Sequence, residues 1–140
     1  MRTVFADTFY WISLANPNDE WHNTVKHVSV SLGPAQLVTT DEVLTEFLTY
    51  YSGRGAALRA VAVKLVRATM CDPNIRTVPQ SRTSFERALR LYEGRADKDF
   101  SLTDCSSMEA MREHGLHEVL THDHHFEQES FQILIKEKVP

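Results

Sequence analysis

The sequence predicts an α/β fold, a three-layer α/β/α sandwich around a central parallel sheet of about five strands. Short apolar runs alternate with longer segments of helical periodicity along the whole chain. Turn and capping residues separate these segments. Strands that alternate with helices favour a parallel sheet covered by helices on both faces, with right-handed crossovers.

Five segments are expected to be strands, because they are short, apolar and bounded by turn or capping residues. They are residues 3–6, 36–39, 75–78, 118–121 and 131–135.

Helices are expected between these strands, with start and stop signals at their ends. The first covers residues 8–15, and the second begins after a cap at Asp19 and ends at Gly33. Thr39 and Glu42 fit a capping box for the third helix. The apolar stripe of this third helix consists of Val43, Leu44, Phe47, Leu48 and Tyr51.

Three more helices are expected in the second half of the chain. Residues 56–70 have an amphipathic pattern, Ser81 or Thr83 opens the next helix, and residues 103–114 form the last, which Gly115 ends. In the helix of residues 56–70, we expect six side chains to face inward, those of Leu58, Val61, Ala62, Leu65, Val66 and Met70.

The whole chain, residues 1–140, is expected to form a single globular domain. No apolar run approaches the roughly 20 residues that a membrane span requires, and the first residues are too short an apolar stretch for a signal peptide. Two cysteines, Cys71 and Cys105, make no disulfide framework. These features favour a cytoplasmic protein that does not enter a membrane.

Charge is unevenly distributed along the chain, although the net value is only −4. Residues 53–98 carry a net charge of +6, whereas residues 1–52 and 99–140 carry −4 and −6. A polyanion held on the basic middle segment could reach an acidic centre formed by the ends. The alternative is that these basic residues are ordinary solvated helix faces.

Four acidic residues, Asp7, Glu46, Asp104 and Asp123, lie near predicted strand ends or in the first turns of predicted helices. The carboxyl ends of parallel strands meet at one crevice, where residues distant in sequence converge. Converging carboxylates repel one another unless cations neutralise them. The pattern therefore predicts a divalent-metal site.

Each acid also has a structural interpretation. Asp7 suits a helix N-cap, Glu46 a surface helix position, and Asp123 a turn. Ser101 and Asp104 fit a second capping box. The hydroxyls of Ser101 and Thr103 could instead orient a metal-bound carboxylate, and Asp99 is interpreted as an outer, supporting acid.

His122, His124 and His125 form a histidine cluster without cysteine partners or helical spacing, which argues against a zinc site. We interpret them as polar loop residues, with His125 and Phe126 packed at the turn. A phosphate contact by one imidazole is the alternative.

Together these segments resemble the PIN-domain ribonucleases, and among them the VapC-type toxins of toxin–antitoxin pairs. The resemblance covers the whole chain. It rests on residues 5–8, 40–47, 99–105 and 120–126, of which Ser-Leu-Thr-Asp104 and Thr121-x-Asp123-x-His125-Phe126 are the most specific. Phe9 departs from the family pattern, in which a small residue is common there.

The resemblance implies a metal-dependent endoribonuclease with one or two Mg²⁺ or Mn²⁺ ions. Asp7, Asp104 and Asp123 would be metal ligands, and Glu46 a ligand or a base that orients water. Thr8, Ser101 and Thr121 would support these ligands or contact the phosphate. It also implies an RNA substrate, an antitoxin partner and a homodimer. The alternatives are a non-catalytic PIN scaffold that binds RNA or protein, and a DNA-directed flap-type nuclease. A receiver-like signalling domain would need an acidic pair and a late lysine that the chain does not supply at those positions.

Overall fold

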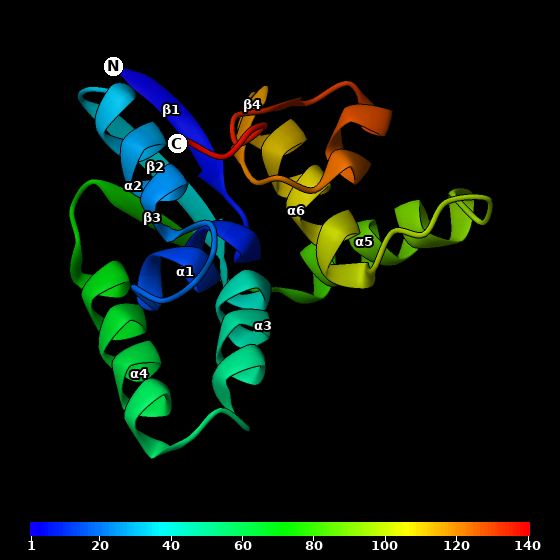
Figure 1. Ribbon diagram of the computed structural model, residues 1–140. Coiled ribbons are helices and arrows are strands. Elements are labelled where there is room, and N and C mark those ends of the chain that lie inside the picture. The colour runs from blue at the N-terminus through cyan, green and yellow to red at the C-terminus, as the bar shows by residue number, and fades with distance from the viewer.

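A five-stranded parallel sheet forms the centre of the protein, as the computed structural model of residues 1–140 shows (Figure 1). The strand order is β3-β2-β1-β4-β5, and every neighbouring pair is parallel. The strands are β1 (Arg2–Ala6), β2 (Ala35–Thr40), β3 (Ile75–Val78), β4 (Glu118–Leu120) and β5 (Gln132–Ile133). The predicted α/β class with a parallel sheet of five strands is therefore confirmed.

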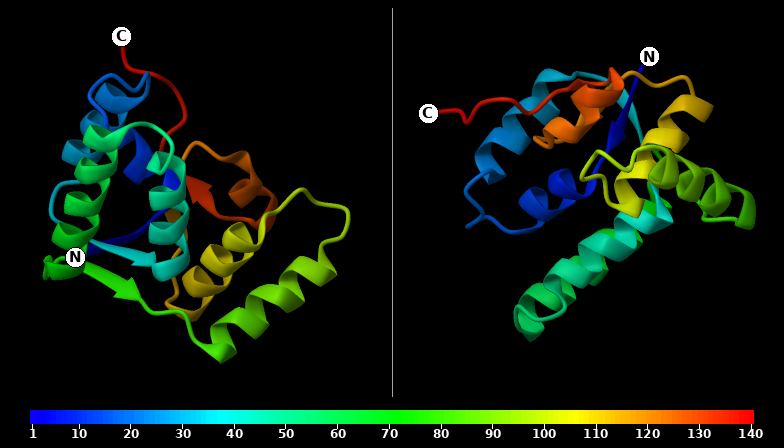
Figure 2. Two further views of the ribbon diagram at one scale, coloured as in Figure 1. Left: turned by 90° about the horizontal axis from the view of Figure 1, so that it is seen from below. Right: turned by 90° about the vertical axis from the view of Figure 1, so that its right-hand side faces the viewer.

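Six α-helices and one 3₁₀ helix surround the sheet. They are α1 (Thr8–Ala15), α2 (His22–Ser31), α3 (Asp41–Tyr51), α4 (Ala56–Cys71), α5 (Arg82–Gly94), α6 (Leu102–Glu113) and η1 (His124–Glu129). Figures 1 and 2 show α1, α2 and α4 on one side of the sheet and α5 and α6 on the other. The hairpin of α3 and α4 extends beyond the carboxyl ends of the strands. None of the helices has the length and apolar character needed to cross a membrane.

One cluster of 25 buried residues joins the sheet to both helical layers. It includes Phe5 of β1, Phe47 of α3 and Met108 of α6, each with no exposed surface. Burying large apolar side chains is the main favourable contribution to folding. The core therefore fixes the positions of β1, α3 and α6, and three of the predicted acids lie on or next to these elements: Asp7 after β1, Glu46 in α3 and Asp104 in α6.

Two of the predicted helix starts differ from the structure. The side chain of Thr40, not Thr39, caps α3 by accepting from the Val43 amide at 3.1 Å. Thr39 Oγ1 instead donates to the Ala6 carbonyl and accepts from Trp11 Nε1, which ties β2 to β1 and α1. The second helix begins only at His22, because the Asp19 carboxylate accepts from the Trp21 amide in the preceding turn.

The inward face predicted for residues 56–70 is only partly correct. Ala62 and Thr69 are the buried residues of α4, whereas Val61 is 44% exposed and Met70 is 62% exposed. Helix α4 packs on α3, α1 and β3, and no further layer lies outside it (Figure 1). An amphipathic pattern indicates that a helix has an inward face, but not how wide that face is.

Candidate metal centre

The sheet reverses its strand order between β1 and β4, and two functional segments leave it there. The chain places β2 and β3 on one side of β1, and β4 and β5 on the other. Asp7 follows β1 directly and Thr121 follows β4 directly. The hydroxyl of Thr121 donates a hydrogen bond of 3.0 Å to Asp7 Oδ2. The two strand ends are thus joined at the crevice where open α/β sheets bind their ligands.

The carboxyl group of Asp7 is almost fully buried, with 5% of the residue exposed. It occupies the N-cap position of α1 but makes no side-chain capping bond. Burial raises the pKa of Asp7 to about 7, and the nearby carboxylates of Asp104 and Glu46 raise it further. Hydrogen bonds from the Thr8 backbone and the Thr121 side chain lower it. A carboxyl group in these surroundings is partly protonated near neutral pH, and a bound cation would favour its charged form.

Asp104 lies in the first turn of α6, where it forms the predicted capping box with Ser101. The Asp104 amide donates to Ser101 Oγ, and the Ser101 amide donates to Asp104 Oδ2, both at 3.0 Å. The Asp104 side chain is 13% exposed. Its pKa is raised mainly by burial and further by the carboxylates of Asp123 and Glu46. The capping box holds one carboxylate oxygen in place, and the packing around it disfavours negative charge.

Asp123 caps η1 and lies close to Asp104. Its Oδ1 accepts from the His125 amide at 2.9 Å, and its own amide donates to Thr121 Oγ1 at 3.1 Å. The single hydroxyl of Thr121 therefore contacts both Asp7 and the backbone of Asp123. This arrangement fixes the spacing between the two acids that follow β1 and β4.

The imidazole of His125 completes a compact group of possible ligands. Its Nδ1 lies 3.1 Å from Asp123 Oδ1 and 3.5 Å from Asp104 Oδ2. One ligand atom from each of these three residues lies within 4.8 Å of the others. Two carboxylates and one imidazole at this separation fit the donor set of a single divalent ion.

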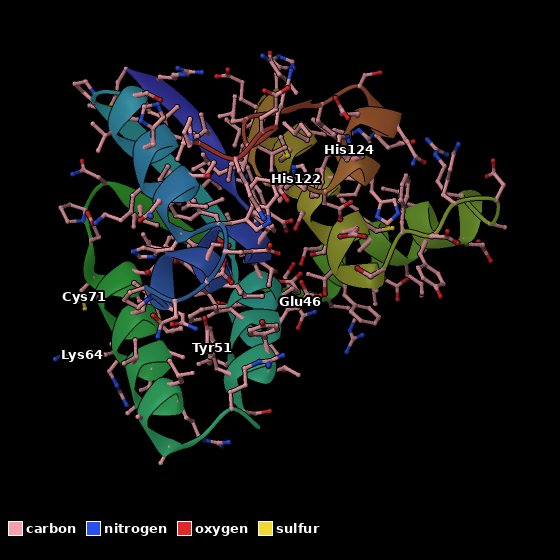
Figure 3. All side chains as sticks on the ribbon, in the orientation of Figure 1. Glu46, Tyr51, Lys64, Cys71, His122 and His124 are labelled. Atoms are coloured by element: carbon pink, nitrogen blue, oxygen red, sulfur yellow. The ribbon has the colours of Figure 1, made fainter.

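Glu46 extends from the side of α3 that faces α5 and α6 (Figure 3). It lines a cavity of about 420 Å³ between these helices, together with Asp41, Glu42 and Thr103. Its charge raises the pKa of both Asp7 and Asp104. Glu46 thus lies close enough to influence the other acids, although it is outside the compact group of Asp104, Asp123 and His125.

The remaining predicted residues have different environments. The Thr8 hydroxyl is buried without a hydrogen-bond partner, and Thr103 lines the cavity beside Glu46. Asp99 is exposed and lines a separate cavity with Tyr92 and Lys98. The structure therefore places Thr8 and Thr103 near the acids, whereas Asp99 faces another hollow of the surface.

Two residues make contacts at the site that the sequence did not predict. His125 was interpreted as a loop residue, yet its ring contacts both Asp104 and Asp123. Glu42 was assigned to a capping box, but its carboxylate accepts a hydrogen bond from Ser106 of α6. The sequence did contain one indication of the His125 contact, because Asp123 and His125 are two residues apart across a capped turn. No pattern in the sequence indicates the contact between Glu42 and Ser106.

The basic middle segment divides between two surfaces. Lys64 of α4 points away from α3 and from Glu46 (Figure 3). On α5 and the loop after it, Arg87 pairs with Glu113 at 3.0 Å and Arg95 with Glu129 at 2.9 Å. The interpretation of these charges as solvated helix faces thus fits Lys64 and also Arg87, whose pair with Glu113 is exposed. Arg95, by contrast, pairs with Glu129, whose side chain is only 8% exposed, and helps to fix the loop after α5 against η1.

Comparison with known proteins gives a consistent result. Residues 4–131 match the PIN domain family. The chain is 28% identical over 131 residues to the 23S rRNA-specific endonuclease VapC20 of two Mycobacterium tuberculosis strains, covering 91% of this chain and 95% of that protein.

Solved structures share the fold. The crystal structure of M. tuberculosis VapC20, described as a sarcin-ricin loop cleaving toxin, gives a TM-score of 0.82 at 25% identity, over 91% of this chain and 95% of that one. A toxin–antitoxin complex from Klebsiella pneumoniae gives a TM-score of 0.67 at 13% identity, over 97% of this chain and 99% of that one. FitAcB from Neisseria gonorrhoeae gives a TM-score of 0.63 at 15% identity, over 94% of this chain and 96% of that one. At such low identity the last two show a common fold alone.

Proposed function

Because this chain belongs to the PIN domain family, we propose that it is a divalent-metal-dependent endoribonuclease and the toxin of a toxin–antitoxin pair. One observation carries the proposal. The acids Asp7, Asp104 and Asp123 come from three separate segments near the switch of the sheet. Asp104 and Asp123 lie within ligand distance of each other and of His125. Thr121 links Asp7 to the Asp123 backbone, and no Lys or Arg forms a salt bridge with the three acids. Such a group of carboxylates is stable in its charged form only with a bound cation.

The residues fit Mg²⁺ or Mn²⁺, as one or two ions, because both ions bind carboxylate oxygens. We assign Asp104 and Asp123 as ligands, with Asp7 as the ligand closest to the sheet. A bound ion of this kind makes hydroxide available from water near neutral pH and stabilises charge on phosphoryl oxygens.

The protein supplies orientation and proton control around this centre. The capping box of Ser101 holds Asp104, and Thr121 holds Asp7 and the backbone of Asp123. Glu46, whose charge raises the pKa of both Asp7 and Asp104, would be a further ligand or would accept a proton from the attacking water. The buried hydroxyl of Thr8 is a candidate for contact with the ligands or the phosphate.

RNA is the substrate we propose, and the relative VapC20 suggests where to look. Its name gives 23S rRNA as its target, and its structure is described as that of a sarcin-ricin loop cleaving toxin. Splayed bases in such loops are accessible to proteins in a way that paired bases are not. A structured ribosomal RNA loop is therefore the first substrate to test.

Two further expectations belong to the same proposal. The chain would be inhibited by a cognate antitoxin, as solved toxin–antitoxin complexes share its fold. It would also form a homodimer and act in the cytoplasm.

The test is cleavage of an end-labelled oligonucleotide that carries the sarcin–ricin loop of 23S rRNA. We expect cleavage with Mg²⁺ or Mn²⁺, none with EDTA, and a loss of about a hundredfold or more in Asp104→Asn. Glu113→Gln is the matched control, because Glu113 lies at the exposed end of the same helix and contacts only Arg87. Equal cleavage by Asp104→Asn and the parent protein would refute the assigned site. Metal-independent cleavage would refute the mechanism.

A further inference from the structure

We propose that His125 is a nitrogen ligand of the metal centre and that this ligand makes the centre prefer Mn²⁺ to Mg²⁺. The proposal rests on the proposed function in one respect, that a divalent ion binds at Asp104 and Asp123. It adds a ligand of a different chemical type and a consequence for the choice of ion.

The spacing of the three side chains matches neighbouring ligands on one ion. Octahedral ions with metal–oxygen bonds near 2.1 Å place adjacent ligand atoms about 3 Å apart. His125 Nδ1 is 3.1 Å from Asp123 Oδ1 and 3.5 Å from Asp104 Oδ2. Little movement is therefore needed for all three atoms to contact the same ion.

The lack of a hydrogen-bond partner for the buried imidazole nitrogen supports metal binding. His125 Nδ1 is buried and has no hydrogen-bond partner, although two carboxylate oxygens lie beside it. Buried polar atoms of proteins nearly always have a partner, and an exception calls for an explanation such as an ion. An ion bound between these groups would satisfy this nitrogen together with the two neighbouring carboxylates.

The surrounding structure holds this ring in place. Phe100 packs edge-on against the ring with centroids 5.6 Å apart, and the backbone amide of His125 is bonded to Asp123. Phe126, the next residue, is completely buried and anchors the turn. A ring fixed on the backbone and on one edge loses little further freedom when it binds an ion. The Nδ1 lone pair requires the proton to be on Nε2.

Ion preference follows from the mixed donor set. Mg²⁺ favours oxygen ligands and keeps several waters, whereas imidazole is a common ligand of transition ions. Mn²⁺ accepts carboxylate and imidazole ligands together. An imidazole at this position thus adds binding free energy to Mn²⁺ that Mg²⁺ does not gain to the same degree.

The test measures the ion itself and needs no RNA. Mn²⁺ is added to the metal-free protein, and pulsed electron paramagnetic resonance detects coupling between Mn²⁺ and ¹⁴N. We expect coupling from a directly bound imidazole in the parent protein and in His124→Gln, and its absence in His125→Asp. His124 is a matched control because it lies in the same turn and its ring pairs with Glu127 instead.

A second readout is the ratio of Mn²⁺ to Mg²⁺ affinity, from competition titrations followed by the free Mn²⁺ signal. We expect His125→Asp to reduce this ratio about tenfold, because it replaces nitrogen by oxygen while keeping a ligand at the position. Bound Mn²⁺ without ¹⁴N coupling, or an unchanged ratio in His125→Asp, would overturn the proposal but leave the nuclease assignment intact. Absence of Mn²⁺ binding would overturn both. Nitrogen coupling in a protein that cleaves no RNA would support the ligand and contradict the nuclease.

Discussion

The two halves of the candidate centre are built differently. Asp7 and Thr121 form the strand half, which follows β1 and β4 and is buried in the sheet. Asp104, Asp123 and His125 form the helix half, at the starts of α6 and η1, where the Asp123 side chain remains 34% exposed. In the helix half, backbone amides hold the carboxylates, whereas in the strand half a hydroxyl holds Asp7.

This contrast suggests a division of tasks. The strand half places one carboxyl group where burial disfavours its charge, so its protonation depends on whether a cation is present. The helix half fixes the directions of its oxygens before any ion arrives, since each acid is bonded into a cap. Substitutions in the strand half should therefore alter the pH dependence of stability and of metal binding. Substitutions in the helix half should alter the geometry and affinity of metal binding.

Asp7→Asn should have the largest effect and the clearest signature. The raised folded pKa of Asp7 contributes stability that is complete below its unfolded value of 3.8 and is lost as pH rises to about 7. In EDTA, Asp7→Asn should thus be more stable than the parent at pH 8 by roughly 2–4 kcal/mol, at about 1.4 kcal/mol for each pKa unit. The same variant should lose RNA cleavage about a hundredfold or more.

Urea unfolding of both proteins in EDTA, from pH 4 to pH 8, measures this effect. The difference should grow across the range and approach a constant value above pH 7. A parent protein whose stability relative to Asp7→Asn does not change with pH would show that Asp7 is charged without metal, and would remove the distinction between the halves.

Thr121→Val should have an intermediate effect that reaches both halves. The variant removes the donor to Asp7 and the acceptor for the Asp123 amide. Because the Thr121 hydrogen bond lowers the pKa of Asp7, its loss should raise that pKa further. We expect metal affinity to fall about tenfold and its pH dependence to move to higher pH. Calorimetric titration with Mn²⁺ at several pH values measures both, and Thr121→Ser should restore them.

Ser101→Ala should have the smallest effect and separate stability from binding. It removes the cap that Asp104 shares, at a cost of about 1 kcal/mol. Ser81→Ala is the matched control, because Ser81 forms a capping box on α5 with Ser84, whose amide and hydroxyl complete it. Thermal unfolding should show similar losses for both variants, and only Ser101→Ala should weaken Mn²⁺ binding. Equal Mn²⁺ affinity in the two variants would mean that the Ser101 hydroxyl does not help to orient Asp104, whose carboxylate still accepts from the Ser101 backbone amide.

Much of this centre follows from sequence because its framework is regular. Asp7 and Asp123 follow strands, and parallel strands bring their carboxyl ends to one edge, so their proximity needs only the correct strand assignments. Ser101 and Asp104 form a local motif with a fixed spacing of three residues, which a sequence shows directly. The five strands were found for the same reason, since each is a short apolar run between turn signals.

The other features depend on packing between distant segments. Glu42 meets Ser106 only because α3 and α6 lie side by side, and the shift of the α3 cap from Thr39 to Thr40 leaves Glu42 free to do so. The ring of His125 turns toward Asp104 because Phe100 and the η1 turn direct it there. The exposure of Met70 depends on which helices lie next to α4. None of these facts is a property of a single segment.

The most direct test of a metal centre at the end of β1 and β4 is a crystal structure with Mn²⁺, using anomalous scattering to locate the ion. A peak is expected in contact with carboxylate oxygens of Asp104 and Asp123, on the side of these residues that faces Asp7. A crystal that holds Mn²⁺ only at other surfaces, or none at saturating concentration, would contradict the assignment of these acids as the nuclease centre.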